Sequence, residues 1–211
     1  MKKVCCLILA LVMTLLCAGC FGPSQEELLA KVGGTWSLRY EEEADYVREF
    51  LTNYDFYEEE IALVTTPLCS VKTITLKADG TLSYSEPPAE VKACVREFLL
   101  GVYDELYEGR ASLSEVYETD LSGYSKEEFL QSYADMYEYA TFDAMIDGFV
   151  EGAYDWETLE NYSTGTFTIT SLQMMFDVEG TDNDGAVRYK VEGDTLTLTF
   201  SDATEVYTKV K

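Results

Sequence analysis

The stretch at residues 165–211 constrains the fold of this chain more than any other part of the sequence. It reads GTFTITSLQMMFDVEGTDNDGAVRYKVEGDTLTLTFSDATEVYTKVK, in which short runs alternate apolar and polar residues between turns rich in Gly, Asp and Asn. Alternation with a period of two is typical of strands with one buried and one exposed face. Because the apolar side of such a β-meander must be covered, partner strands have to come from earlier in the chain.

Earlier runs supply these partners on both sides of Asp79-Gly80, a strong signal for a hairpin turn. With the meander they predict about eight strands, at 34–40, 71–78, 81–86, 164–170, 172–179, 185–191, 194–201 and 204–210. Eight antiparallel strands suffice to close a small barrel whose interior is filled or holds one small ligand. The apolar parity shifts near Thr170, which predicts a bulge or a turn there.

Two stretches break the strand pattern and are predicted to be helical. At about 41–64 and 88–160, apolar and aromatic residues recur at three- and four-residue steps. Gly109 is expected to end one helix, and Ser125 with Glu128 forms a capping box that begins another. The predicted fold class is therefore α+β, mostly β with helical insertions.

Three of the helical segments share a Glu-Phe-Leu motif followed by Tyr and acidic residues, at 49–60, 97–109 and 128–140. One interpretation is a repeated recognition face of tyrosines and acids. The other is three similar amphipathic helices that pack on the barrel, and we favour it. Their unequal spacing argues against a regular solenoid.

Charge and composition exclude several functions. The chain has 15 Lys and Arg against 39 Asp and Glu, a net charge of -24, which disfavours nucleic acid and anionic membrane surfaces as partners. It has no His, so the commonest general base, the imidazole metal ligands and every His-containing triad are missing. No nucleophile context or phosphate-binding glycine pattern is recognisable. We expect neither catalysis nor a cofactor.

The N-terminus has the pattern of a signal peptide. Lys2 and Lys3 precede an apolar stretch at 4–16 that is too short to span a bilayer comfortably. Residues 16–20, LCAGC, resemble the lipobox of bacterial lipoproteins, although Cys17 stands where Leu is commoner. The alternative is ordinary secretion, with cleavage after Ala18 or Gly19.

The lipoprotein resemblance implies a particular fate for Cys20. A diacylglyceryl group would be attached to it, residues 1–19 would be removed, and acyl chains such as palmitate would anchor the protein. The expected location is the extracytoplasmic face of the bacterial cell membrane. Residues 20–33 would then form a short tether and a helix, with Ser24 and Glu27 in a capping box, ahead of a barrel domain at 34–211.

A second resemblance concerns the barrel itself. Gly34-Thr35-Trp36 on the first strand, followed by a closing C-terminal meander, is similar to the lipocalin-like barrels. The resemblance covers 34–40, about 71–86 and 165–211. It implies an antiparallel up-and-down barrel around a cup, with Trp36 packed across its closed end.

The remaining candidate sites are two cysteines and several acidic segments. Cys69 and Cys94 could form a disulfide that closes a loop of about 25 residues, worth roughly 3 kcal/mol, or could be two buried thiols. Segment 177–185 fails the EF-hand spacing for calcium, and we interpret it as an acidic hairpin loop. The acidic runs 41–43 and 58–60 are interpreted as solvated faces, and no metal site is expected.

The sequence thus predicts a lipid-anchored, non-enzymatic protein that binds a small apolar ligand, in the barrel or on the helices. It does not indicate the ligand-binding residues. The alternative is an interaction or scaffold module that binds a surface protein through its Tyr-rich helical insertion. A carboxylate-based hydrolase stays open only because the many acids offer many pairs.

Overall fold

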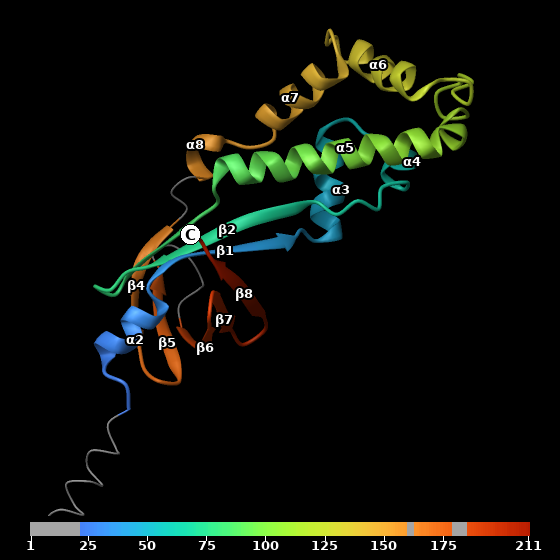
Figure 1. Ribbon diagram of the computed structural model, residues 1–211. Coiled ribbons are helices and arrows are strands. Elements are labelled where there is room, and N and C mark those ends of the chain that lie inside the picture. The colour runs from blue at the N-terminus through green and yellow to red at the C-terminus, as the bar shows by residue number, and fades with distance from the viewer. Residues whose placement is uncertain (1–21, 160–162, 179–184) are drawn as a thin grey trace, which may run out of the picture. The chain divides into compact units, whose positions relative to one another are not determined.

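A computed structural model of the chain describes residues 22–159, 163–178 and 185–211 (Figure 1). The described residues divide into two compact units. We call residues 22–37, 74–84, 163–178 and 185–211 the barrel unit, and residues 38–73 and 85–159 the helical unit. Strands β1 and β2 each contribute residues to both units.

The barrel unit is built on a closed sheet in which each strand pairs with its neighbours in the sequence, and β1 pairs with β8. Its strands are β1 Gly34–Glu41, β2 Cys69–Leu76, β3 Thr81–Ser85, β4 Ser163–Ile169, β5 Gln173–Val178, β6 Gly185–Glu192, β7 Thr195–Thr199 and β8 Thr204–Lys209. The ladders from β3 to β8 are antiparallel, and β8 is also antiparallel to β1, with Trp36 opposite Lys209. The expected lipocalin-like up-and-down barrel of eight strands is confirmed.

The alternation of the sequence becomes the two faces of the barrel wall. In β5, buried Met174, Phe176 and Val178 alternate with exposed residues, as a strand with one solvent face requires. Trp36 and Tyr207 are 0% exposed. Burial of each large apolar side chain contributes about 1.5–3 kcal/mol. The inward positions of this barrel therefore carry large, well-buried side chains.

Helix α2, Gln25–Val32, precedes the barrel and is joined to it through Trp36. The indole N–H of Trp36 donates to the carbonyl of Val32 at 2.7 Å, at the C-terminal end of the helix. The expected capping box of Ser24 and Glu27 begins this helix and is confirmed. The role of Trp36 at a closed barrel end stays a prediction.

Two turns of the barrel follow the local sequence. Gly80 has φ +84, a conformation that glycine adopts readily, and the Asp79 carboxylate accepts from the backbone N–H of Thr81 at 2.9 Å. Between β4 and β5, the N–H of Thr170 donates to the carbonyl of Gln173 at 2.9 Å. The parity shift near Thr170 is thus a turn.

The helices of the helical unit are α3 Ala44–Asn53, α4 Glu58–Ile61, α5 Pro88–Leu113, α6 Lys126–Met136, α7 Phe142–Gly152 and α8 Trp156–Leu159. Their apolar stripes bury one another in a separate core. Its largest fully buried members include Tyr103, Phe98 and Phe129. The apolar stripes of these helices are therefore buried against one another within the helical unit.

Two helix boundaries differ from the prediction. The continuous helix expected at about 41–64 is broken, because Asp55 adopts φ 60 between α3 and α4. Gly109 does not end a helix but lies inside α5, where a Cβ would come within 2.6 Å of Leu63. Gly109 permits a close approach of the α4–β2 connection, so packing outweighs its weak helix propensity.

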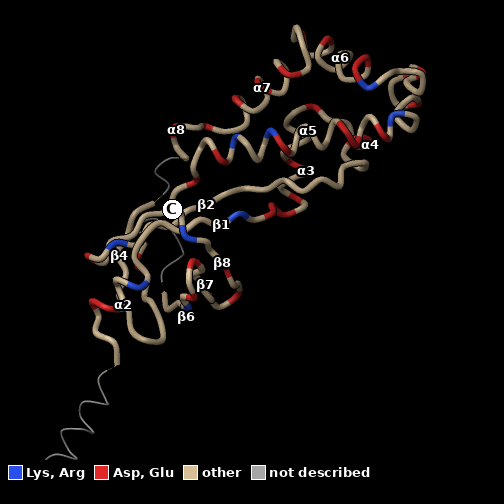
Figure 2. Tube along the Cα trace, viewed as in Figure 1, with Lys and Arg blue, Asp and Glu red and all other residues tan. Residues whose placement is uncertain are grey.

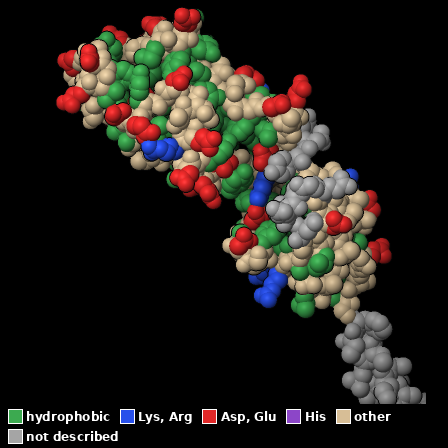
Figure 3. Space-filling view, turned by 180° about the vertical axis from the view of Figure 1, so that it is seen from behind, with side chains coloured by type: hydrophobic (Ala, Val, Ile, Leu, Met, Phe, Trp, Pro, Cys, Tyr) green, Lys and Arg blue, Asp and Glu red, His purple; other side chains and the backbone are tan. Residues whose placement is uncertain are grey.

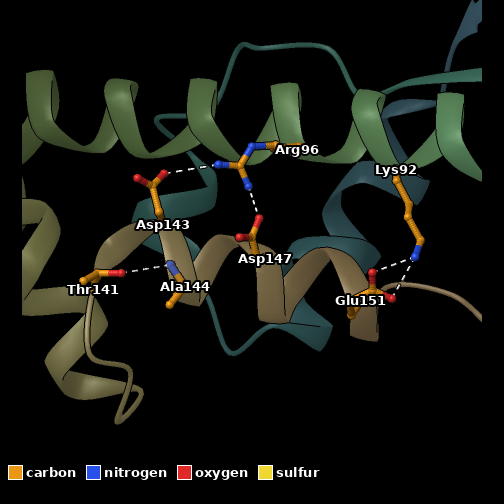
Figure 4. A network of polar contacts seen from close by, with 7 residues as sticks. All are labelled: Lys92, Arg96, Thr141, Asp143, Ala144, Asp147 and Glu151. Carbon is orange, nitrogen blue, oxygen red and sulfur yellow. Dashed lines mark hydrogen bonds and ion pairs between the residues drawn. The ribbon is translucent and has the colours of Figure 1, made fainter.

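Acidic residues are distributed along α6 and α7 (Figure 2), and on the face of the helical unit seen in Figure 3 hydrophobic side chains reach the surface among acidic ones. Some of these acids pair with the few basic residues of α5. Arg96 lies 3.2 Å from Asp143 and also pairs with Asp147, and Lys92 binds both oxygens of Glu151 at 2.6 and 2.8 Å (Figure 4). These ion pairs link α5 to α7 on an exposed face.

Candidate functional site

A buried carboxylate lies in the helical unit. Glu60, on the single-turn helix α4, is only 2% exposed. Its Oε2 accepts a hydrogen bond from the backbone N–H of Tyr57 at 2.8 Å. Its Oε1 accepts from the hydroxyl of Tyr133 at 2.6 Å and from the hydroxyl of Tyr117. Removing a carboxylate from water is energetically costly, and these three hydrogen bonds offset that cost.

Three separate elements bring these groups together. Glu60 comes from α4, Tyr117 follows the C-terminus of α5, and Tyr133 lies within α6. The capping box of Ser125 and Glu128 begins α6, as the sequence predicts, and so sets which of its residues face inward. The two tyrosine hydroxyls also lie 3.3 Å from each other. The result is a compact polar cluster that is distant in sequence and close in space.

The surroundings keep these hydroxyl groups protonated. Burial raises the pKa of Tyr117 and of Tyr133 well above the ordinary value, and the nearby negative charge of Glu60 raises both further. Burial, followed by the same charge, raises the pKa of Tyr137 to about 12. At neutral pH these groups therefore act as hydrogen-bond donors and not as acids or nucleophiles.

Tyr103 adds a third tyrosine hydroxyl to this region. It is 0% exposed, and within the described ranges its hydroxyl has no hydrogen-bond partner. Its ring packs edge to face against that of Tyr133, with ring centroids 5.0 Å apart and an interplanar angle of 74°. It packs in the same way against the ring of Phe142, with a centroid distance of 5.1 Å and an interplanar angle of 86°. Such edge-to-face packing holds the rings in fixed orientations.

A small apolar pocket adjoins the cluster. Its volume is about 190 Å³, and it is lined by Tyr117, Thr119, Leu121, Tyr124, Phe129, Ser132, Tyr133 and Met136. Two of these residues are the tyrosines that donate to Glu60. Met136 is 56% exposed, whereas Phe129 is fully buried. An apolar cavity with a few convergent polar groups is the usual form of a ligand site. We call it the tyrosine pocket.

An acidic depression lies beside the tyrosine pocket and shares Tyr124 and Ser132 with it. Its volume is about 610 Å³, and its other lining residues are Glu127, Glu128, Gln131 and Asp135. Hydrogen bonds from Ser125 lower the pKa of Glu128, so this carboxylate is charged at neutral pH. Helix α6 thus has an apolar hollow and an anionic hollow next to each other.

Most residues singled out from the sequence lie elsewhere. Cys20 and residues 179–184 are outside the described residues, so lipidation and the interpretation of segment 177–185 stay predictions. Cys69, at the start of β2, and Cys94, in α5, are both free thiols. Burial raises the pKa of Cys94, which reduces its reactivity. No disulfide joins Cys69 to Cys94 in this structure.

The central residue of the site was misinterpreted from the sequence. Glu58, Glu59 and Glu60 read as one solvated acidic face, but only the first two are exposed. The capping position of Glu60, three residues after Tyr57, was a signal that could have separated it from its neighbours. Nothing local indicated its two tyrosine partners, which lie 57 and 73 residues away.

The fold defines a class: a closed, eight-stranded antiparallel barrel whose connections carry a helical unit. No protein family, characterised protein or solved structure matches this chain. In the described part of the chain, no group of three or more Cys, Asp or Glu side chains is placed to hold a metal ion. Nor does any described helix combine the length and apolar character that crossing a bilayer requires. Function must therefore be argued from the site.

Proposed function

We propose that this is a lipid-anchored, non-enzymatic binding protein of the extracytoplasmic face of the bacterial cell membrane. Its ligand is small and carries an apolar group, which the tyrosine pocket receives. The anchor is the acylated Cys20, which the lipobox pattern at 16–20 supports. The observation that carries the binding function is the apolar tyrosine pocket beside a buried polar cluster.

The site belongs to the helical unit and not to the barrel cup. Inward positions of the barrel hold Trp36, Phe167, Phe176 and Tyr207, each at most 4% exposed. A barrel of eight strands has just enough interior for such side chains to fill. The tyrosine pocket, by contrast, is open to solvent at Met136. This moves the expected small-ligand site from the barrel to the helices.

The anchor can be tested by metabolic labelling of cells with an alkyne analogue of palmitate. Cys20→Ala should abolish labelling and release the protein from the membrane fraction. Cys6→Ala is the matched control, since it removes a cysteine of the apolar stretch outside residues 16–20 and should leave labelling intact. Equal labelling of both variants would contradict lipidation at Cys20.

The pocket can be tested with three probes that share a phenyl ring and a short chain: phenethylamine, 2-phenylethanol and 3-phenylpropionate. At least one should bind, as measured by saturation-transfer NMR and titration calorimetry. Met136→Trp should obstruct the pocket and weaken binding about tenfold, or roughly 1.4 kcal/mol. Met175→Trp, at a similarly exposed methionine of the barrel wall, is the matched control. Equal effects of the two variants would contradict this site.

A second candidate function is the binding of a basic surface protein. The acidic depression next to the tyrosine pocket supports it, because the two hollows share residues of α6 and could receive a longer segment. Crosslinking in intact cells through a photoreactive residue at Gln131 would capture such a partner. Glu127→Lys should abolish that crosslink if charge attraction directs the docking.

A further inference from the structure

We propose that the tyrosine pocket selects an organic ammonium ion, and that buried Glu60 sets this preference through Tyr117 and Tyr133. This inference rests on the proposed function, because it names the ligand class of the same pocket. The predicted ligand has a positively charged amine on a ring or chain about the size of one side chain.

The first step concerns hydrogen atoms. A tyrosine hydroxyl has a single hydrogen to donate. Tyr117 and Tyr133 both direct that hydrogen to the same oxygen of Glu60. What each hydroxyl can still offer a ligand is an oxygen lone pair. A ligand that bonds to these oxygens must therefore be a hydrogen-bond donor, as an ammonium group is.

The second step concerns the aromatic rings. The pocket is lined by the rings of Tyr117, Tyr124, Phe129 and Tyr133. The face of an aromatic ring is electron-rich and attracts cations, by about 0.5–2 kcal/mol depending on desolvation. Phe129 and Tyr133 are held edge to face, with centroids 5.2 Å apart at 61°. The rings and the hydroxyl oxygens thus favour the same sign of charge.

The third step concerns the charge behind the tyrosines. No lysine or arginine of the described ranges pairs with Glu60, whose partners are three hydrogen-bond donors. A buried negative charge without a counter-ion attracts a cation strongly, since screening by water is weak there. Glu127 and Asp135 in the adjoining depression add the same sign of potential next to the pocket.

The fourth step concerns size. The pocket volume of about 190 Å³ is below the 300–1,000 Å³ typical of sites for drug-sized ligands. It suits one ring or one short alkyl chain. The fit is therefore to a small amine or to the ammonium end of a longer molecule.

The three phenyl probes test this preference, because they differ mainly in end-group charge. Phenethylamine should bind about tenfold tighter than 2-phenylethanol, and 3-phenylpropionate should bind weakest. Raising the NaCl concentration should reduce the affinity for the amine and leave that for the alcohol nearly unchanged. Weaker binding of the amine than of the alcohol would overturn the proposal.

The role of Glu60 is tested by Glu60→Gln, which keeps the shape and removes the charge. The preference for amine over alcohol should fall about tenfold, toward equal affinities. Glu59→Gln, an exposed neighbour on the same helix, is the matched control and should keep the preference. Tyr117→Phe, which retains the ring, should lower the affinity for the amine less than Glu60→Gln does. A preference that is unchanged in Glu60→Gln with intact far-UV circular dichroism would overturn the role of Glu60.

The outcomes separate this inference from the proposed function. If the alcohol or the carboxylate binds as well as the amine, and Met136→Trp weakens that binding, the pocket is real and the ammonium preference is wrong. If no probe shows binding that depends on Met136, both fail. Nα-acetyl-lysine methylamide distinguishes the sources of the ammonium group, because tighter binding than phenethylamine would assign it to a lysine of a protein partner.

Discussion

The two units of this protein have cores of different chemistry. The barrel buries apolar side chains, and its strands alternate cleanly between buried and exposed positions. The helical unit also buries an apolar core, but it adds a buried carboxylate, Glu60; the other buried polar side chains in the described residues, Ser70 and Thr73, are uncharged and lie on β2 of the closed sheet. A buried charge with hydrogen-bond partners is therefore a feature of the helical unit, and apolar packing does not require it.

The pKa values of the tyrosines can also be compared between the two units. In the helical unit, seven tyrosines have a raised pKa, mainly through burial: Tyr40, Tyr54, Tyr103, Tyr117, Tyr133, Tyr137 and Tyr154. In the barrel unit, burial raises the pKa of Tyr84 and Tyr189. Perturbed titratable groups concentrate at functional sites more often than in purely structural cores. The helical unit differs in that four of its tyrosines, Tyr103, Tyr117, Tyr133 and Tyr137, have a pKa raised partly by the charge of a single buried carboxylate, Glu60.

Alkaline pH should produce the largest effect and should act on the helical unit first. Burial raises the pKa of Tyr54 and Tyr137 to about 12, from the usual 10.0. A group whose pKa rises on folding stabilises fully below its unfolded pKa, and this stabilisation is lost as the pH climbs toward the folded value. The helical unit should thus lose stability between about pH 10 and pH 12.

The measurement follows circular dichroism at 222 nm for the helices and the fluorescence of Trp36 for the barrel. The chain has two tryptophans, so Trp156→Phe leaves Trp36 as the barrel reporter. Loss of the Trp36 signal at a lower pH than the helical signal would contradict the contrast between the units.

Truncation of a core phenylalanine should have the next largest effect. Phe98→Ala in the helical unit and Phe176→Ala in the barrel each remove a ring that is at most 3% exposed. Each should cost about 3–5 kcal/mol of unfolding free energy, because a cavity remains. Urea unfolding monitored by Trp156 and by Trp36 should show that each variant mainly shifts the transition of its own unit. Equal shifts of both transitions in both variants would mean that the two cores unfold as one.

Removal of the buried carboxylate should have a moderate effect confined to the helical unit. Glu60→Ala leaves the hydroxyls of Tyr117 and Tyr133 without their acceptor and should cost about 2–3 kcal/mol. Glu59→Ala, at an exposed position, should change stability by less than about 0.5 kcal/mol. The same urea titration measures both. Comparable effects of the two substitutions would show that Glu60 is not a buried hydrogen-bond centre.

Loss of a surface ion pair should have the smallest effect. Arg96→Met removes the pairs with Asp143 and Asp147, whose side chains are 78% and 69% exposed. Because water screens such pairs, the cost should be below about 1 kcal/mol and should shrink in high salt. A larger loss of unfolding free energy that does not depend on salt would contradict the interpretation of these contacts as exposed, water-screened ion pairs.

Local pattern was enough to predict the barrel. Period-two alternation identified all eight strands, and Asp79-Gly80 marked a turn, because the two-residue period of a strand is written directly in the sequence. The helical insertions were also recognised, but not the break at Asp55 or the continuation of α5 through Gly109. Both features depend on contacts between segments that are distant in the sequence, and the pattern within one segment does not reveal such contacts.

The site could not be predicted in the same way. The proposal for Cys20 could be made from the sequence because it depends on a short linear pattern at residues 16–20 and not on the fold. Glu60 looks like its exposed neighbours in the sequence, and its burial depends on hydroxyls that α6 and the end of α5 bring to it. The residues next to Glu60 in the sequence therefore gave no indication of its role.

The amino-acid sequence by itself determined the strand order, the acidic character and the absence of histidine, and it carries the pattern on which the proposed anchor rests. Each of these depends on residue type or on spacing within one segment. Only the tertiary structure decided which acidic residue is buried within the described ranges, which tyrosines surround it and where a pocket opens. The physical reason is that burial and hydrogen bonding arise between segments, and folding is what brings those segments together.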